Sequence, residues 1–137
     1  MRGGRTSRPV ILSPMSKQIR IVNLSRNESV LAGIKYCDDF FSRLKGFTFR
    51  KALREDEGLV LAENRDSRLD TSIHMLFVWT DLAVYWVNSN KVIVDKQLAK
   101  SWHLYYASQA PAQYVVELNP CQMDVFQIGD QLDFVND

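Results

Sequence analysis

At 137 residues, with 46% hydrophobic and 24% charged residues, the chain has the size and composition of one globular domain, not of a disordered segment. Three of its 17 basic residues are Arg2, Arg5 and Arg8, so residues 10–137 carry 14 basic and 16 acidic side chains. A near-neutral domain lacks the clustered basic face that phosphate binding requires, so we do not expect a nucleic-acid partner.

Cysteine usage and apolar runs indicate a cytoplasmic protein. Cys37 and Cys121 give no framework of paired spacings, which favours reduced thiols. The apolar run at 10–12 is too short for a signal peptide, and no run approaches the roughly 20 residues of a membrane span. We therefore expect no membrane association, while the sequence leaves the oligomeric state open.

The first half of the chain predicts a tail, two strands and a helix. Residues 1–16 hold Gly, Pro and Arg without periodicity, which predicts a disordered tail before a single domain over 17–137. Alternating apolar residues predict strands near 19–24 and 30–36. Apolar residues then recur at helical spacing, with Asp38 as a candidate cap and Gly46 as a stop, which predicts one short helix near 38–45.

The remainder predicts strands. A strand at 59–62 precedes a charged loop at 63–70, and residues 71–79 are apolar on both alternating faces, which predicts a central strand. The further predicted strands are 82–87, 91–94, 114–118 and 132–135. Many short, mostly antiparallel strands with one helix predict a mainly β fold, either a β-sandwich or a partly closed barrel.

Metal and nucleophile chemistry is not favoured. The residues that could hold a metal are Cys37, His74, His103 and Cys121, but every gap between them exceeds fifteen residues. Zinc sites usually include a local pair of ligands, so we expect no metal and no cofactor. Neither cysteine lies in a recognisable nucleophile turn.

Two segments admit both a structural and a functional interpretation. His74 lies among apolar residues, where it is either a hydrogen-bonded structural histidine or part of a pocket. Trp102 and its neighbouring tyrosines either cover the core or form the rim of a cleft. The basic and aromatic residues of 43–54 resemble a single-strand binding surface, but acids follow at once, and a solvated helix face is favoured.

Three segments in the same order resemble the DUF192 (UPF0127) family of unassigned function. They are Arg-Leu-Lys-Gly-Phe-Thr-Phe-Arg at 43–50, Ser-Ile-His-Met-Leu-Phe at 72–77, and Val-Val-Glu-Leu at 115–118 with Gly-Asp at 129–130. The resemblance covers about Ile19 to Val135 and implies a mainly β, sandwich-like fold.

The chain departs from the family pattern at polar positions. Where the family has Arg and then Phe-Pro-Ile-Asp, this sequence has Trp79 and residues 80–83. The family's Trp-Arg pair corresponds to Trp102 and His103, and Cys121 replaces a glycine. A polar site of the family would therefore be changed or lost here.

These observations favour a non-enzymatic domain that binds a small ligand or a protein partner in a cleft near His74 and Trp102. The candidate ligand-binding residues are Arg50, His74, Asp81, Trp102 and His103. One alternative is a structural or oligomerisation module. Another is an enzyme that uses His74 with Asp81 or Arg50 in acid–base chemistry.

Overall fold

A computed structural model describes most of the chain after residue 16. The described residues are 17–27, 29–39, 43, 45–48, 50, 52–75, 78–103 and 105–137. The predicted tail therefore lies outside the described residues, as do four positions of the predicted helix. Arg43 and Lys45 are helical, and the Arg43 N–H donates to the Asp39 carbonyl at 3.1 Å, as in an α-helical turn.

Seven strands of the described residues form one sheet, with the spatial order β6-β5-β7-β4-β3-β2-β8. All neighbouring pairs are antiparallel except β3 and β4, which are parallel. This arrangement confirms the mainly β class. The strands are β2 (Lys17–Asn23), β3 (Ser29–Cys37), β4 (Gly58–Ser67), β5 (Leu82–Val87), β6 (Ile93–Ala99), β7 (Ala112–Leu118) and β8 (Leu132–Asn136), with a short 3₁₀ helix, η1 (Pro120–Gln122), after β7.

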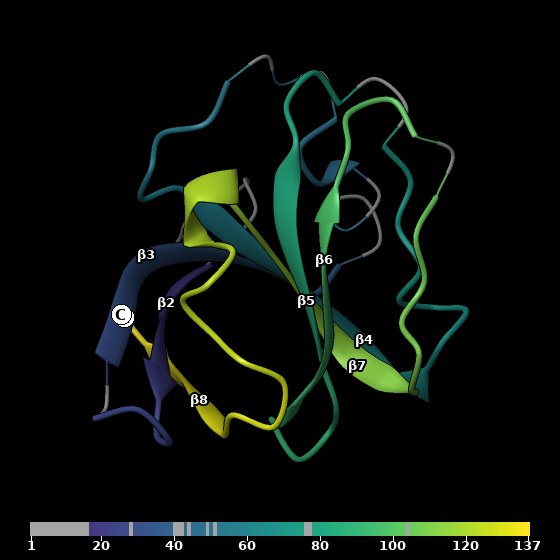
Figure 1. The fold of residues 1–137 in the computed structure, drawn as a ribbon. Helices are drawn as coiled ribbons and strands as arrows, with labels where there is room; N and C mark the ends of the chain where they lie inside the picture. The colour runs from purple at the N-terminus through teal and green to yellow at the C-terminus, as the bar shows by residue number, and fades with distance from the viewer. Residues whose placement is uncertain are drawn as a thin grey trace, which may run out of the picture.

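The sheet curls into a half-barrel, in which the edges formed by β6 and β8 face each other (Figure 1). An isolated bridge joins Val92 to Gln131 at the opening. The Ile93 N–H also donates to the Asp130 carbonyl at 3.0 Å, and the Leu132 N–H donates to Lys91 at 2.8 Å. Of the two predicted architectures, the partly closed barrel is therefore the one that forms.

Both faces of the sheet are buried at β5, which explains why its sequence is apolar throughout. All six of its side chains are buried. Tyr85 and its alternate neighbours pack inside the half-barrel, whereas Trp86 and its alternate neighbours pack on the outer face. A strand covered on both sides needs apolar residues in both registers.

The prediction of a central strand over 71–79 is wrong. In the described part of this segment only Ile73 forms a β-bridge, with Tyr106. Ile73, Met75 and Val78 are nevertheless buried, because they form a covering layer on the outer face of the sheet. Hydrophobic burial is not directional, so an alternating apolar pattern fits a covering segment as well as a strand.

Other predicted boundaries also move. β4 continues through Ser67, so most of the segment predicted as a charged loop is strand, and β6 continues to Ala99. The second half of β4 is largely exposed beyond Ala62, which explains why its charged residues are tolerated there.

The Gly-Asp pair at the opening of the half-barrel has a structural role. Gly129 has a φ of +97°, which a side chain would strain. The buried Asp130 carboxylate accepts hydrogen bonds from Asn23 at 2.9 Å, from Arg26 at 3.0 Å and from the Gln127 backbone at 2.9 Å. Burial acts to raise the pKa of Asp130, but these hydrogen bonds outweigh it, and the pKa lies below its ordinary value.

Candidate functional site

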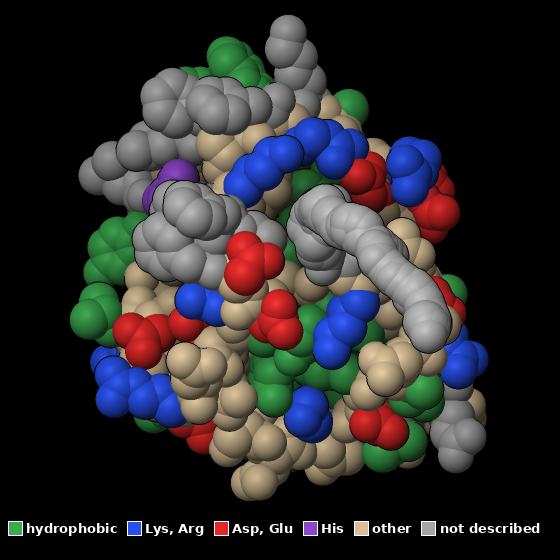
Figure 2. All heavy atoms as spheres, turned by 180° about the vertical axis from the view of Figure 1, so that it is seen from behind, with side chains coloured by type: hydrophobic (Ala, Val, Ile, Leu, Met, Phe, Trp, Pro, Cys, Tyr) green, Lys and Arg blue, Asp and Glu red, His purple; other side chains and the backbone are tan. Residues whose placement is uncertain are grey.

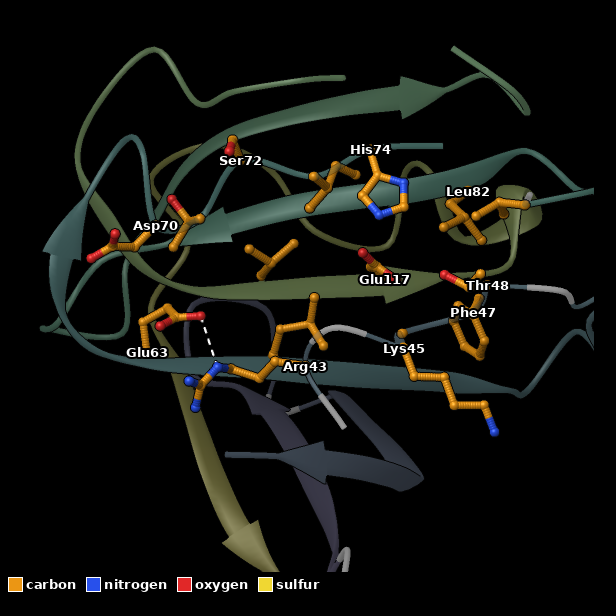
Figure 3. A pocket seen from close by; sticks show the side chains of 16 residues that line it. Arg43, Lys45, Phe47, Thr48, Glu63, Asp70, Ser72, His74, Leu82 and Glu117 are labelled. Atoms are coloured by element: carbon orange, nitrogen blue, oxygen red, sulfur yellow. Dashed lines mark ion pairs between the residues drawn. The ribbon is translucent and has the colours of Figure 1, made fainter. Parts of the chain in front are cut away.

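A pocket of about 270 Å³ lies on the outer face of the sheet, between β4, β5 and β7 and two covering segments, 43–48 and 70–78 (Figure 3). Its apolar wall includes Leu61, Leu82 and Val115 from the three strands. Ile73 and Val78 from a covering segment add to this wall. The volume is slightly below the usual range for small-molecule sites, so the pocket suits a small ligand.

Glu117 is the acidic group at the base of this pocket. Successive side chains of β7 alternate between the two faces, so Val116 and Leu118 enter the half-barrel core while Val115 and Glu117 face the pocket. The Glu117 residue is only 4% exposed. Burial raises the pKa of its carboxyl to about 7.

No described residue makes a hydrogen bond or an ion pair with the Glu117 carboxyl. The 43–48 segment passes close to it at Gly46, where a Cβ atom would lie 3.6 Å from Oε1. Gly46 has a φ of +47°, so the backbone conformation also favours a residue without a side chain. The carboxyl is thus shielded from bulk water but open to the pocket.

Polar side chains surround the rest of the pocket. Thr48 and His74 line it near Glu117, and in Figure 3 the His74 ring and the Glu117 carboxyl point toward the same space. At the other end, Arg43 and Glu63 form an ion pair with a 2.9 Å separation. Burial raises the pKa of Glu63, and the positive charge of Arg43 partly opposes this shift.

Of the five predicted site residues, His74 alone lines this pocket. Its side chain is exposed and is not enclosed by the apolar tract. Arg50 forms a bidentate ion pair with Glu57, at 2.6 and 2.9 Å. The backbone carbonyl of Arg50 accepts a hydrogen bond from the Trp79 N–H at 3.1 Å.

The other three predicted residues lie in loops, Asp81 just before β5 and Trp102 and His103 after β6. Asp81 accepts a hydrogen bond from the Ser101 N–H at 2.9 Å. Trp102 packs edge-on against Trp79, with ring centroids 5.0 Å apart, and His103 stacks on Tyr106 at 5.6 Å. The Trp102 N–H donates to the Met75 carbonyl at 2.8 Å, which ties this loop to the segment that carries His74. These residues therefore hold the covering layer in place beside the pocket.

Sequence analysis did not identify Glu117 as a site residue. Two signals were available: a carboxylate within an otherwise apolar strand, and its place in the Val-Val-Glu-Leu motif. A buried acid in an apolar strand is a candidate functional group because its desolvation must be compensated.

Within the described ranges, no group of three or more His, Cys, Asp and Glu side chains is arranged to hold a metal. Cys37 is buried and Cys121 is exposed. No helix of the described part of the chain has the length and apolar character needed to cross a membrane.

The fold and the pocket define a small β half-barrel domain with a buried acid on the outer face of its sheet. Residues 21–134 match the DUF192 family, which is described as "Uncharacterized ACR, COG1430", and the chain belongs to this family. A UPF0127 protein of Thermococcus kodakarensis is 33% identical over 97 residues, which are 71% of this chain and 60% of that protein. One from Pyrococcus furiosus is 28% identical over 116 residues, which are 83% of this chain and 97% of that protein.

Two crystal structures share the fold. A protein from Sinorhizobium meliloti, described as a candidate transcription regulator, has a TM-score of 0.75 at 19% identity, over 91% of this chain and 98% of its own. A protein of unknown function from Novosphingobium aromaticivorans has a TM-score of 0.72 at 16% identity, over 86% of this chain and 84% of its own. Similarity at these identities shows the fold alone.

Proposed function

We propose that this domain binds a small molecule in the pocket between the 43–48 and 70–78 segments and the outer face of the sheet. The observation that carries the proposal is the buried Glu117 carboxyl, which faces the pocket without a hydrogen-bonding partner among the described residues. Natural ligand sites combine mostly apolar walls with a few convergent polar groups, and this pocket has that composition.

The neighbouring contacts favour binding over the acid–base enzyme considered from the sequence. That enzyme would need Asp81 or Arg50 beside His74. Asp81 instead accepts a hydrogen bond from the Ser101 backbone, and Arg50 is paired with Glu57. Neither Asp81 nor Arg50 lines the pocket with His74.

The surface charge does not favour nucleic-acid binding, although the Sinorhizobium protein of the same fold is described as a candidate regulator of transcription. On the face shown in Figure 2, acidic and basic side chains are interspersed, without a broad field of one sign. Proteins that bind nucleic acids present a basic surface that neutralises several phosphates.

The test is a fragment screen by two-dimensional NMR on the isotope-labelled 137-residue protein. Binding fragments should shift amide resonances of His74 and Glu117 in the wild-type protein. Thr48→Trp, which places a large ring at a pocket-lining position, should abolish these shifts. Gln97→Trp is the control, because Gln97 is also half-buried but lies on β6 and does not line the pocket.

Two results would refute the proposal. One is a screen in which no fragment shifts the pocket resonances. The other is a set of hits that bind equally well to Thr48→Trp and to the wild-type protein, because these fragments would occupy another surface.

A further inference from the structure

The geometry points to a ligand that is a small organic cation, whose N–H groups pair with the Glu117 carboxylate while its apolar part packs against the pocket wall. Protonated amines, amidines and nitrogen heterocycles share this chemistry. The inference rests on the proposed function, since it specifies which class of molecule the same pocket takes.

Among the described residues, none donates a hydrogen bond to the Glu117 carboxyl. A buried carboxylate without a hydrogen-bond donor loses its hydration and gains nothing in return, which is strongly unfavourable. The cost disappears when a charged donor binds beside it, and charge-assisted hydrogen bonds are the strongest of those available to a carboxylate. A cationic donor is therefore the ligand group that gains most from this pocket.

The basic residues that line the pocket, Arg43 and Lys45, are engaged by other groups or directed away from Glu117. The Arg43 side chain is held by the Glu63 carboxylate and by the carbonyls of Asp38 and Ala62. Lys45 is exposed, and in Figure 3 its ammonium group points away from Glu117. Neither of these cations neutralises Glu117, so the position of a positive charge is left for a ligand.

The surroundings of the Glu117 carboxyl also match a cation with an apolar body in shape and polarity. Gly46 presents no side chain toward Oε1, which leaves room for a donor there. The wall beside Glu117 is apolar at Leu82, Val78 and Val115. A molecule with a charged nitrogen at one end and an apolar body at the other end matches both surfaces.

Binding of a permanent cation should also depend on pH. The pKa of Glu117 is about 7 without a ligand, so a cation must displace its proton below neutrality. The other titratable or charged groups that line the pocket are Arg43 and Lys45 from the first covering segment, Glu63 from β4, and Asp70 and His74 from the second covering segment. His74 lines the same pocket as Glu117, so the contributions of the two residues must be separated by mutation.

The experiment compares benzamidinium, benzamide and benzoate, three probes of nearly the same size and shape that differ in charge and donors. Each is titrated into the intact protein, with NMR shifts of the pocket amides as the readout. At pH 8 we expect benzamidinium to bind at least about tenfold more tightly than benzamide, as a charge-assisted hydrogen bond implies, and benzoate to bind most weakly. Benzamidinium affinity should fall by about tenfold from pH 8 to pH 6.

Two variants assign the effect to its source. Glu117→Gln keeps the side-chain shape and should remove both the preference for benzamidinium over benzamide and the pH dependence. His74→Gln should keep both the preference and the pH dependence. If Glu117→Gln does not fold, the comparison of the three probes on the wild-type protein decides the matter by itself.

The outcomes separate this inference from the proposed function. If benzamide or benzoate binds in the pocket as tightly as benzamidinium, or if the preference survives in Glu117→Gln, the inference is wrong and the pocket remains a ligand site. The inference also fails if none of the three probes binds while other fragments do. If no fragment of any class reaches the pocket, both proposals fail together.

Discussion

The free energy of unfolding should fall between pH 4.5 and pH 7 because of one side chain, Glu117. Its ordinary pKa is 4.5 and burial raises this to about 7 in the folded protein. Between these values the folded state holds a proton that the unfolded state has released, so stability decreases as pH rises through this window. A shift of this size corresponds to about 3 kcal/mol, most of which should be lost by pH 8.

The substitution Glu117→Gln isolates this contribution, because an amide carries no titratable proton. Relative to the wild-type protein, the variant should gain about 2.5 kcal/mol between pH 5 and pH 8, which is the part of the effect that falls in this window. The fixed cost of burying an uncharged amide enters equally at both pH values and cancels in the difference.

Urea unfolding at pH 5 and pH 8, followed by circular dichroism and extrapolated to water, measures this difference. Glu55→Gln is the control, since the Glu55 side chain is exposed in the loop before β4. The reasoning is refuted if the stability difference between Glu117→Gln and the wild-type protein is the same at both pH values within about 0.5 kcal/mol.

Three further substitutions test the fold. Asp130→Ala should lower the free energy of unfolding by about 3 kcal/mol in urea at pH 7, because it leaves the donors around the carboxylate unpaired. The pKa of Asp130 is lowered in the folded protein, so the wild-type protein should lose the same stabilisation as the pH falls through that folded-state pKa. Gly129→Ala should cost about 1–2 kcal/mol from backbone strain alone, since a Cβ there meets no atom within 4 Å, and an unchanged urea midpoint would contradict this. Trp86→Phe should lower the free energy of unfolding by about 3 kcal/mol, because it removes the 2.8 Å hydrogen bond from Nε1 to the Thr71 carbonyl and leaves a cavity. An unchanged melting temperature would show that this hydrogen bond does not couple β5 to the covering segment.

The sequence by itself determined the class of the fold and the positions of most strands. Alternating or continuous apolar residues placed strands over residues that lie in β2, β3, β5, β7 and β8, because these patterns depend only on which side chains need burial. Motifs at 43–50, 72–77 and 115–118 identified the family, which the match over 21–134 confirms.

The role of the 71–79 segment was decided by tertiary structure. Its apolar residues predicted a central strand, but Ile73, Met75 and Val78 cover the outer face of the sheet instead. Local sequence specifies that Ile73 and Met75 must be buried, and it does not specify whether a hydrogen-bonded neighbour or a sheet face buries them. His74 is exposed at the pocket for the same reason, since its apolar neighbours face the sheet.

The candidate site likewise depends on contacts between segments that are distant in the chain. Whether an acid in an apolar strand is solvated, paired or isolated depends on the residues that cover it. For Glu117 these include Gly46 and His74, which come from two other parts of the sequence. The sequence therefore determined that Glu117 lies in a β-strand. Only the packing of the covering segments made it a buried carboxyl that faces a pocket, because desolvation is a property of the assembled structure.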